Sequence, residues 1–255
     1  MRTEMEPRQR IILPLDVESV QAGQALVTEL APHVGPFKIG LEFIHAMLTS
    51  LITASDGALA HYIADSVRQL FRLLDGRIFW DGKFDDIPNT VAGASAQVAK
   101  LGVRMFNVHA SAGRAAVEQA VAKKGNSLVL GVSVLTSIDP AECQAIFGRV
   151  PELAVCDFAR MLADVGADGV ICSPQELEIL SQQPWAEKLL KVVPGVRPTW
   201  AAAGDQRRVM TPAEAIRAGA DYLVIGRPIT KPPAEIGGSV KAAKLIAEEI
   251  AQAMG

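Results

Sequence analysis

Aromatic residues are scarce in this chain of 255 residues, since phenylalanine, tryptophan and tyrosine together make up only 5% of it. Hydrophobic residues nevertheless account for 49%, which excludes a disordered chain and allows a large buried core. With so few aromatic rings, that core has to be packed by Val, Ile, Leu and Ala. Such a composition is typical of parallel strands covered by helices.

Cysteine is also rare, and the three cysteines, Cys143, Cys156 and Cys172, are far apart and form no C-x-x-C pair. This spacing argues against a disulfide framework or a zinc site and is typical of a reducing compartment. The first ten residues are polar and charged, so we expect neither a signal peptide nor a membrane anchor. No apolar run is long enough to span a bilayer. We therefore expect a cytoplasmic protein.

An excess of basic residues is missing as well. The chain has 25 Lys and Arg against 28 Asp and Glu, a formal net charge of −3. A nucleic-acid-binding protein normally carries a basic surface, so nucleic acid is not an expected partner.

Short β-branched runs alternate with Ala-rich amphipathic segments along the whole chain. Strands are predicted at 10–16, 36–40, 77–83, 103–109, 127–133, 168–172, 190–194 and 221–226. Helices are predicted after residues 16–19 and over 42–74, 88–101, 112–124, 151–165, 174–181, 212–218 and 240–253. Eight such units predict an α/β protein with the (β/α)8 TIM-barrel fold. An open doubly wound sheet is the alternative, but residues 16–19 lack the glycine-rich first turn typical of it. No linker-like segment is present, so we expect one domain over 1–255 with a polar extension at 1–9.

The strongest local pattern is the run from Trp80 to Thr90, W-D-G-K-F-D-D-I-P-N-T. In such a barrel the active site lies at the carboxyl ends of the strands. Side chains alternate along a strand, so Asp81 and Lys83 are predicted to share one side of it. Asp86 follows on the next loop and Lys38 lies on the neighbouring strand. Alternating charges at close range favour the charged form of each group. A purely structural ion-pair cluster would have the same pattern.

This run resembles the signature of the orotidine 5'-monophosphate decarboxylase family, which is D-x-K-x-x-D followed by I-P-N-T. Further resemblances follow in family order along nearly the whole chain. They comprise L-D-V at 15–17, F-K-I-G at 37–40, V-H-A at 108–110, V-L-T-S at 134–137, C-S-P-Q-E at 172–176, P-G-V-R-P at 194–198, G-D-Q-R-R-V-M-T-P at 204–212 and G-R-P-I-T at 226–230. The resemblance implies a TIM barrel that converts orotidine 5'-phosphate into UMP and CO₂, with neither metal nor organic cofactor.

The resemblance also implies roles for the charged residues. Lys83 is expected to be the general acid that protonates the ring carbon as the carboxylate leaves. Asp81 is expected to lie against the substrate carboxylate, a like-charge contact that disfavours the bound ground state. Lys38 is expected to hold Asp81 and the ribose, and Asp16 to bind ribose hydroxyls.

Other roles concern the partner subunit, the base and the phosphate. Asp86 and Thr90 are expected to reach into the site of a second subunit, which implies a homodimer with shared active sites. Thr136 is expected to contact the pyrimidine or the closing loop. The phosphate end is expected to comprise Arg197, Gln206, Gly226 and Arg227, where Arg227 pairs with the phosphate and Gly226 leaves its backbone N–H accessible.

Two residues depart from the family pattern. Gly82 stands where a larger aliphatic residue is usual, and Asp85 stands where the bacterial pattern has histidine. Asp81, Asp85 and Asp86 also leave a Mg²⁺ site open, although Lys83 would compete with the ion.

Two further functions remain as alternatives. One is a Mg²⁺-dependent enzyme of keto-hexulose phosphates, which shares D-x-K-x-x-D, and the other is a non-catalytic nucleotide-binding homologue. His109, at the end of the fourth strand, is expected at most to line the pocket.

Overall fold

The computed structural model describes residues 5–201 and 210–255. Eight parallel strands form a closed barrel in sequence order, and β8 pairs with β1 to complete it. The strands are β1 (Ile11–Pro14), β2 (Phe37–Gly40), β3 (Ile78–Phe84), β4 (Met105–His109), β5 (Leu128–Val132), β6 (Gly169–Ile171), β7 (Leu190–Pro194) and β8 (Tyr222–Val224). The predicted (β/α)8 barrel is confirmed, and each strand lies at its predicted place.

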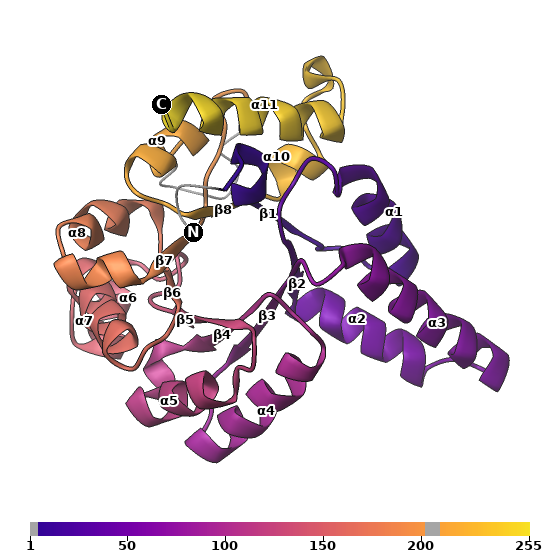
Figure 1. Ribbon diagram of the computed structural model, residues 1–255, viewed down its shortest axis with the longest axis horizontal. Helices are drawn as coiled ribbons and strands as arrows, with labels where there is room; N and C mark the ends of the chain where they lie inside the picture. Colours follow the sequence, from indigo (N-terminus) through magenta and orange to yellow (C-terminus); the bar gives the residue numbers. More distant parts are fainter. Residues whose placement is uncertain (1–4, 202–209) are drawn as a thin grey trace.

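Helices surround the ring of strands (Figure 1). They are α1 (Val20–Leu30), α2 (Leu41–Ile52), α3 (Gly57–Leu74), α4 (Pro88–Lys100), α5 (Arg114–Lys123), α6 (Pro140–Phe147), α7 (Pro151–Asp164), α8 (Leu177–Ser181), α9 (Pro212–Arg217), α10 (Arg227–Thr230) and α11 (Ser239–Ala253). Short 3₁₀ turns lie at Pro7–Arg10, Ala110–Ala112, Pro174–Glu176, Pro184–Lys188 and Ala234–Ile236. Among the described residues, no helix is both long and apolar enough to cross a membrane.

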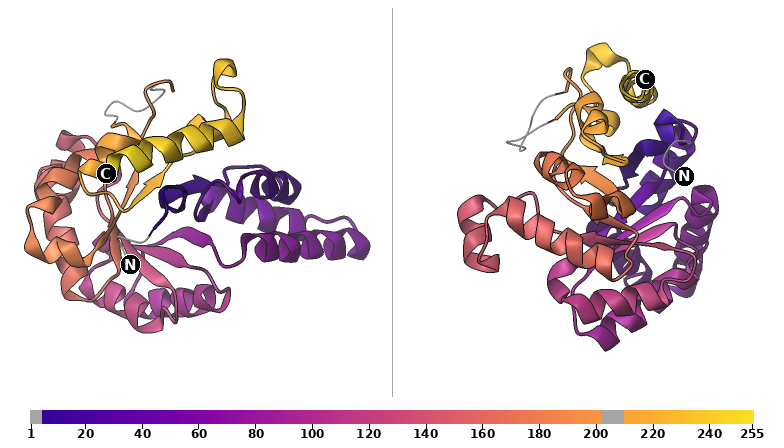
Figure 2. Two further views of the ribbon diagram at one scale, coloured as in Figure 1. Left: turned by 45° about the horizontal axis from the view of Figure 1, so that its top comes forward. Right: turned by 60° about the vertical axis from the view of Figure 1, so that its left-hand side comes forward.

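The expected single helix over 42–74 is wrong, because the structure has two helices there. α2 ends at Ile52, and α3 begins after Asp56, whose side chain accepts a hydrogen bond of 2.8 Å from the N–H of Leu59. This N-cap starts a new helix, since it satisfies a backbone donor that the helix itself leaves unpaired. The two helices lie side by side and extend away from the barrel (Figure 2).

The helix boundaries that sequence predicted at 174 and 212 are real capping sites. Ser173 with Glu176, and Thr211 with Glu214, each form a reciprocal capping box. The first of these opens a 3₁₀ turn, and α8 follows it, so the helix predicted over 174–181 is only partly α-helical. These caps fix where the loops above β6 and β7 end.

The core contains more aromatic residues than the composition led us to expect. Phe37, Phe43, Phe79 and Phe106 are all fully buried. Phe79 lies inside the barrel in a cluster with Ile12, Met105, Leu130, Val192 and Tyr222. The expectation of a core of Val, Ile, Leu and Ala alone is therefore wrong, because the few aromatic rings are concentrated in the interior. This packed layer closes the barrel beneath the charged strand ends.

Candidate functional site

Three charged side chains meet at the carboxyl ends of β2 and β3. Asp81 is almost completely buried, and both of its carboxylate oxygens contact a lysine. Its Oδ1 atom accepts a hydrogen bond of 2.6 Å from Nζ of Lys83, and its Oδ2 atom lies 3.0 Å from Nζ of Lys38. Burial of a lone carboxylate is costly, so the two lysines are what allow it to stay ionised there.

Asp16 extends this cluster on the side of β1. It follows β1 by two residues, is mostly exposed, and its Oδ1 atom lies 3.7 Å from Nζ of Lys38. Lys38 therefore lies between an exposed carboxylate and a buried one. The sequence predicts a charged group of Lys38, Asp81, Lys83 and Asp86. The structure brings Lys38, Asp81 and Lys83 together and adds Asp16, whereas Asp86 lies apart from them within one chain.

The electrostatics of Asp81 follow from these contacts. Burial alone would raise the pKa of Asp81. The positive charges of Lys38 and Lys83 and the hydrogen bonds from Lys83 and Asn107 lower it by more. The pKa of Asp81 therefore lies below its ordinary value. His109, at the end of β4, is half-buried, and this burial lowers its pKa, although Asp85 acts in the opposite direction. The site therefore holds Asp81 as a carboxylate and favours neutral His109.

The backbone of β3 is irregular where it carries these groups. The pairing register with β4 shifts between Trp80 and Phe84, and Lys83 adopts a left-handed φ of 48°. A non-glycine residue in this conformation stores about 1–3 kcal/mol of strain, and such residues cluster at functional sites. Lys83 keeps this conformation because the surrounding structure holds it in place.

Asn107 on β4 is also part of the cluster, although it is not among the site residues predicted from the sequence. Its side chain is fully buried, donates a hydrogen bond of 2.6 Å to Oδ1 of Asp81, and accepts one of 2.7 Å from the backbone N–H of Lys83. The available signal was a polar residue two positions before His109 in an otherwise apolar strand, where inward-facing positions alternate.

Asp86 does not join the charged cluster within one chain. It is exposed, and its carboxylate accepts a hydrogen bond of 2.7 Å from the N–H of Ile87. Thr90, in the first turn of α4, is exposed as well. Neither residue contributes to the ion pairs around Asp81 in the described part of the chain.

The residues predicted at the phosphate end are only partly described. Arg197 is buried just beyond β7, and its backbone N–H bonds to the carbonyl of Met210 across the segment 202–209. Gly226 and Arg227 follow β8, and Arg227 is exposed at the start of α10. Gln206 lies outside the described residues.

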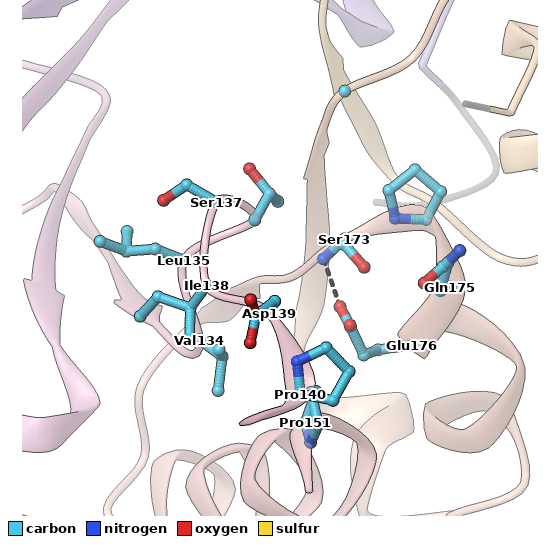
Figure 3. Close-up of a pocket in the computed structure, with 13 residues that line it drawn as sticks. Val134, Leu135, Ser137, Ile138, Asp139, Pro140, Pro151, Ser173, Gln175 and Glu176 are labelled. Carbon is cyan, nitrogen blue, oxygen red and sulfur yellow. Dashed lines mark hydrogen bonds between the residues drawn. The ribbon is translucent and has the colours of Figure 1, made fainter. Parts of the chain in front are cut away.

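A cavity of about 560 Å³ lies above β5, β6 and β7, at the same end of the barrel as the charged cluster. Thr136, which is exposed, is one of its lining residues, as are Ser173, Gln175 and Gly195. Figure 3 shows Leu135 and Ile138 on one side of the cavity and Ser173 with Glu176 on the other. The backbone N–H of Ser173 donates a hydrogen bond to the carboxylate of Glu176. The mouth of the barrel thus combines a charged half with an open, partly apolar half.

Asp81, Asp85 and Asp86 are not assembled as metal ligands. Within residues 5–201 and 210–255, no three His, Cys, Asp or Glu side chains form a group that could hold a metal ion. Cys143, Cys156 and Cys172 are free thiols, and burial raises the pKa of each.

Comparison with known proteins places these features in a family. Residues 9–239 match the family model described as "Orotidine 5'-phosphate decarboxylase / HUMPS family". The chain is 41% identical to orotidine 5'-phosphate decarboxylase of Moorella thermoacetica, covering 96% of this chain and 94% of that protein. It is 43% identical to the enzyme of the same name from Gloeothece citriformis, covering 95% and 98% of the two chains.

The structure is similar to solved structures as well. The crystal structure of orotidine 5'-phosphate decarboxylase from Lactobacillus acidophilus superposes with a TM-score of 0.73 at 28% sequence identity. The superposition covers 95% of this chain and 99% of that one. The similarity therefore extends over the whole barrel, including the strands that carry the charged cluster.

Proposed function

The chain belongs to the orotidine 5'-phosphate decarboxylase / HUMPS family, and on that premise we propose that it is a carboxy-lyase that converts orotidine 5'-phosphate into UMP and CO₂ in pyrimidine biosynthesis. The family model alone does not choose between its two named branches. The choice is supported by relatives of about 40% identity that carry the decarboxylase name over more than nine-tenths of both chains. The single structural observation that carries the proposal is the Lys38–Asp81–Lys83 arrangement.

The reaction leaves a carbanion-like centre at the ring carbon that loses CO₂, and this centre needs a proton. Lys83 supplies it in our proposal, because its ammonium group is partly exposed at the mouth of the barrel and is held 2.6 Å from Asp81. The proton moves from Nζ to the ring carbon, and Lys83 becomes neutral until water reprotonates it. No metal or organic cofactor takes part in this scheme.

Asp81 has two roles in the proposal. Its negative charge repels the substrate carboxylate, which disfavours the bound substrate but not the transition state, where that carboxylate is leaving as neutral CO₂. It also holds the Lys83 ammonium in position. Lys38 and Asp16 lie on the other side of Asp81, where they are available for the ribose hydroxyl groups.

The remaining parts of the substrate are assigned to the rest of the barrel mouth. Thr136 and the cavity above β5 to β7 offer space for the pyrimidine. Arg197, Gln206, Gly226 and Arg227 bind the phosphate in our proposal, since phosphate sites of such barrels usually lie at the last two strands. Arginine at this end suits bidentate pairing with phosphate oxygens.

The active form is proposed to be a homodimer with shared sites. Asp86 and Thr90 are exposed and lie directly before and three residues after Ile87, a hydrophobic residue that is 66% exposed in the single chain. An exposed aliphatic side chain between two polar ones at the rim of the site is what a second copy of the chain would cover. In this arrangement Asp86 completes the charged cluster of its neighbour.

The test is a continuous absorbance assay of purified protein with orotidine 5'-phosphate, with and without EDTA. We expect turnover that EDTA does not change and UMP as the product. Turnover of a keto-hexulose phosphate that EDTA abolishes would instead support the other branch of the family. Tight binding of UMP with no turnover of either substrate would identify a non-catalytic homologue.

A further inference from the structure

A buried asparagine joins the two central charged residues from a neighbouring strand. Asn107 lies in the middle of β4 and is fully buried. Burial of a primary amide costs free energy unless its donor and acceptor are both paired. A residue of this kind at an inward-facing position therefore depends on the groups it contacts.

The side chain of Asn107 contacts both members of the catalytic pair at once. Its Nδ2 atom donates to Oδ1 of Asp81 at 2.6 Å, and its Oδ1 atom accepts from the backbone N–H of Lys83 at 2.7 Å. The two contacts require opposite ends of the amide, since a carboxylate only accepts and an N–H only donates. One rigid side chain thereby fixes the separation of the Asp81 carboxylate from the Lys83 backbone.

The irregularity of β3 explains why this contact exists. Trp80 pairs with Phe106 and Phe84 pairs with Val108, so three residues of β3 lie opposite Asn107 alone. The bulge turns Lys83 into the left-handed region. Its N–H bonds to the amide oxygen of the Asn107 side chain, which supplies the acceptor at this bulge.

We infer that Asn107 is a positioning residue for the reaction, which holds the Lys83 backbone in its left-handed conformation and the Asp81 carboxylate against the Lys83 ammonium. The inference rests on the proposed function, since it gives Asn107 a role in the same active site. Asn107 acts through Asp81 and Lys83, because both of its hydrogen bonds are to them.

The pKa of Asp81 depends on the charges around it as well as on the amide of Asn107. Lys38 faces it from β2, Lys83 from its own strand and His109 from β4, while Asp16 reaches it only through Lys38. The amide donates to the ionised carboxylate and so favours that form. Removal of the amide, with the other charges unchanged, therefore raises the pKa of Asp81.

Two isosteric variants separate the contacts. Asn107→Leu removes both hydrogen bonds at similar volume, whereas Asn107→Asp keeps the acceptor for Lys83 but places a second carboxylate next to Asp81. Ser127→Ala is the matched control. Ser127 is also buried, and its hydroxyl group donates a hydrogen bond to the carbonyl of Val103. It precedes β5 and so lies at the opposite end of the barrel from the site.

We expect kcat on orotidine 5'-phosphate to fall about ten- to a hundredfold in both Asn107 variants, as for loss of a hydrogen bond to a charged group, with KM changed less than about threefold. The acidic limb of the pH profile of kcat should move to higher pH, further for Asn107→Asp than for Asn107→Leu. Ser127→Ala should keep the kcat and profile of the unmodified protein.

A second measurement does not depend on turnover. Titration of the Asp81 carboxyl carbon by ¹³C NMR should give a higher midpoint in both Asn107 variants, even if the protein does not act on orotidine 5'-phosphate. Folded variants with kcat within twofold of the unmodified protein and an unchanged Asp81 midpoint would overturn the inference. So would loss of folding in both variants together, because Asn107 would then serve only the stability of the barrel.

Discussion

Nζ of Lys83 lies 2.6 Å from Oδ1 of Asp81, although the two residues are only two positions apart on one strand. On a regular strand such neighbours point the same way but stand several ångströms apart at Cα. The left-handed φ of Lys83 and the register shift of β3 accompany the short contact. The central ion pair of the site therefore lies on an irregular part of the strand.

The lowered pKa of Asp81 makes stability depend on pH. A carboxyl group whose pKa is lower in the folded chain stabilises that chain above its ordinary pKa, which is 3.8 here. The contribution is lost as pH falls through the folded value. We expect the urea midpoint of the unmodified protein to fall more steeply between about pH 5 and about pH 3 than that of Asp81→Asn. Equal slopes for the two proteins would contradict this account of Asp81.

Gly82 is expected to tolerate no larger side chain while Trp80 keeps its place. A Cβ atom there would lie 2.9 Å from Nε1 of Trp80 and 3.0 Å from Cε1 of Phe84. Gly82→Ala should therefore lower the free energy of unfolding by about 1–3 kcal/mol, measured by urea denaturation. Adding Trp80→Phe, which removes the indole nitrogen, should recover part of that loss. No loss in the single variant would show that Trp80 moves freely.

Shared active sites predict complementation between two inactive variants. Lys83→Ala and Asp86→Ala each impair every site of their own homodimers. A mixed dimer has one site with Lys83 from one chain and Asp86 from the other, and one site with neither. If subunits exchange at random, mixing equal amounts should restore about a quarter of the unmodified activity, since half the dimers are mixed and half their sites are complete. No recovery after exchange is demonstrated with labelled chains would refute sharing.

Much of the barrel follows from local patterns that the structure retains. The strand at 36–40 is a short apolar run that ends in Lys38 and Gly40, and it forms β2 as predicted. A period of two along this strand predicts Asp81 and Lys83 on one side of it, and their side chains do meet, although β3 is irregular at Lys83. Asp56 shows where such patterns fail, because its capping role divides a segment whose hydrophobic spacing is helical on both sides.

The rest of the site depends on contacts between strands. A lone asparagine in M-F-N-V-H carries no sign of its partners, which the register shift of β3 creates. Asp86 shows the opposite limit, because the pattern D-x-K-x-x-D groups it with Lys83 although its side chain turns to Ile87 within one chain. Sequence spacing specifies which residues share a strand, whereas register and assembly decide which side chains meet.

The most direct test of the central role of Lys83 is the orotidine 5'-phosphate absorbance assay on Lys83→Met beside the unmodified protein. Methionine keeps most of the side-chain length but cannot donate a proton. We predict that kcat falls by at least about 10²–10⁴-fold, the usual contribution of a general acid, while circular dichroism shows an intact fold. Turnover of Lys83→Met within tenfold of the unmodified enzyme would contradict the assignment of Lys83 as the proton donor.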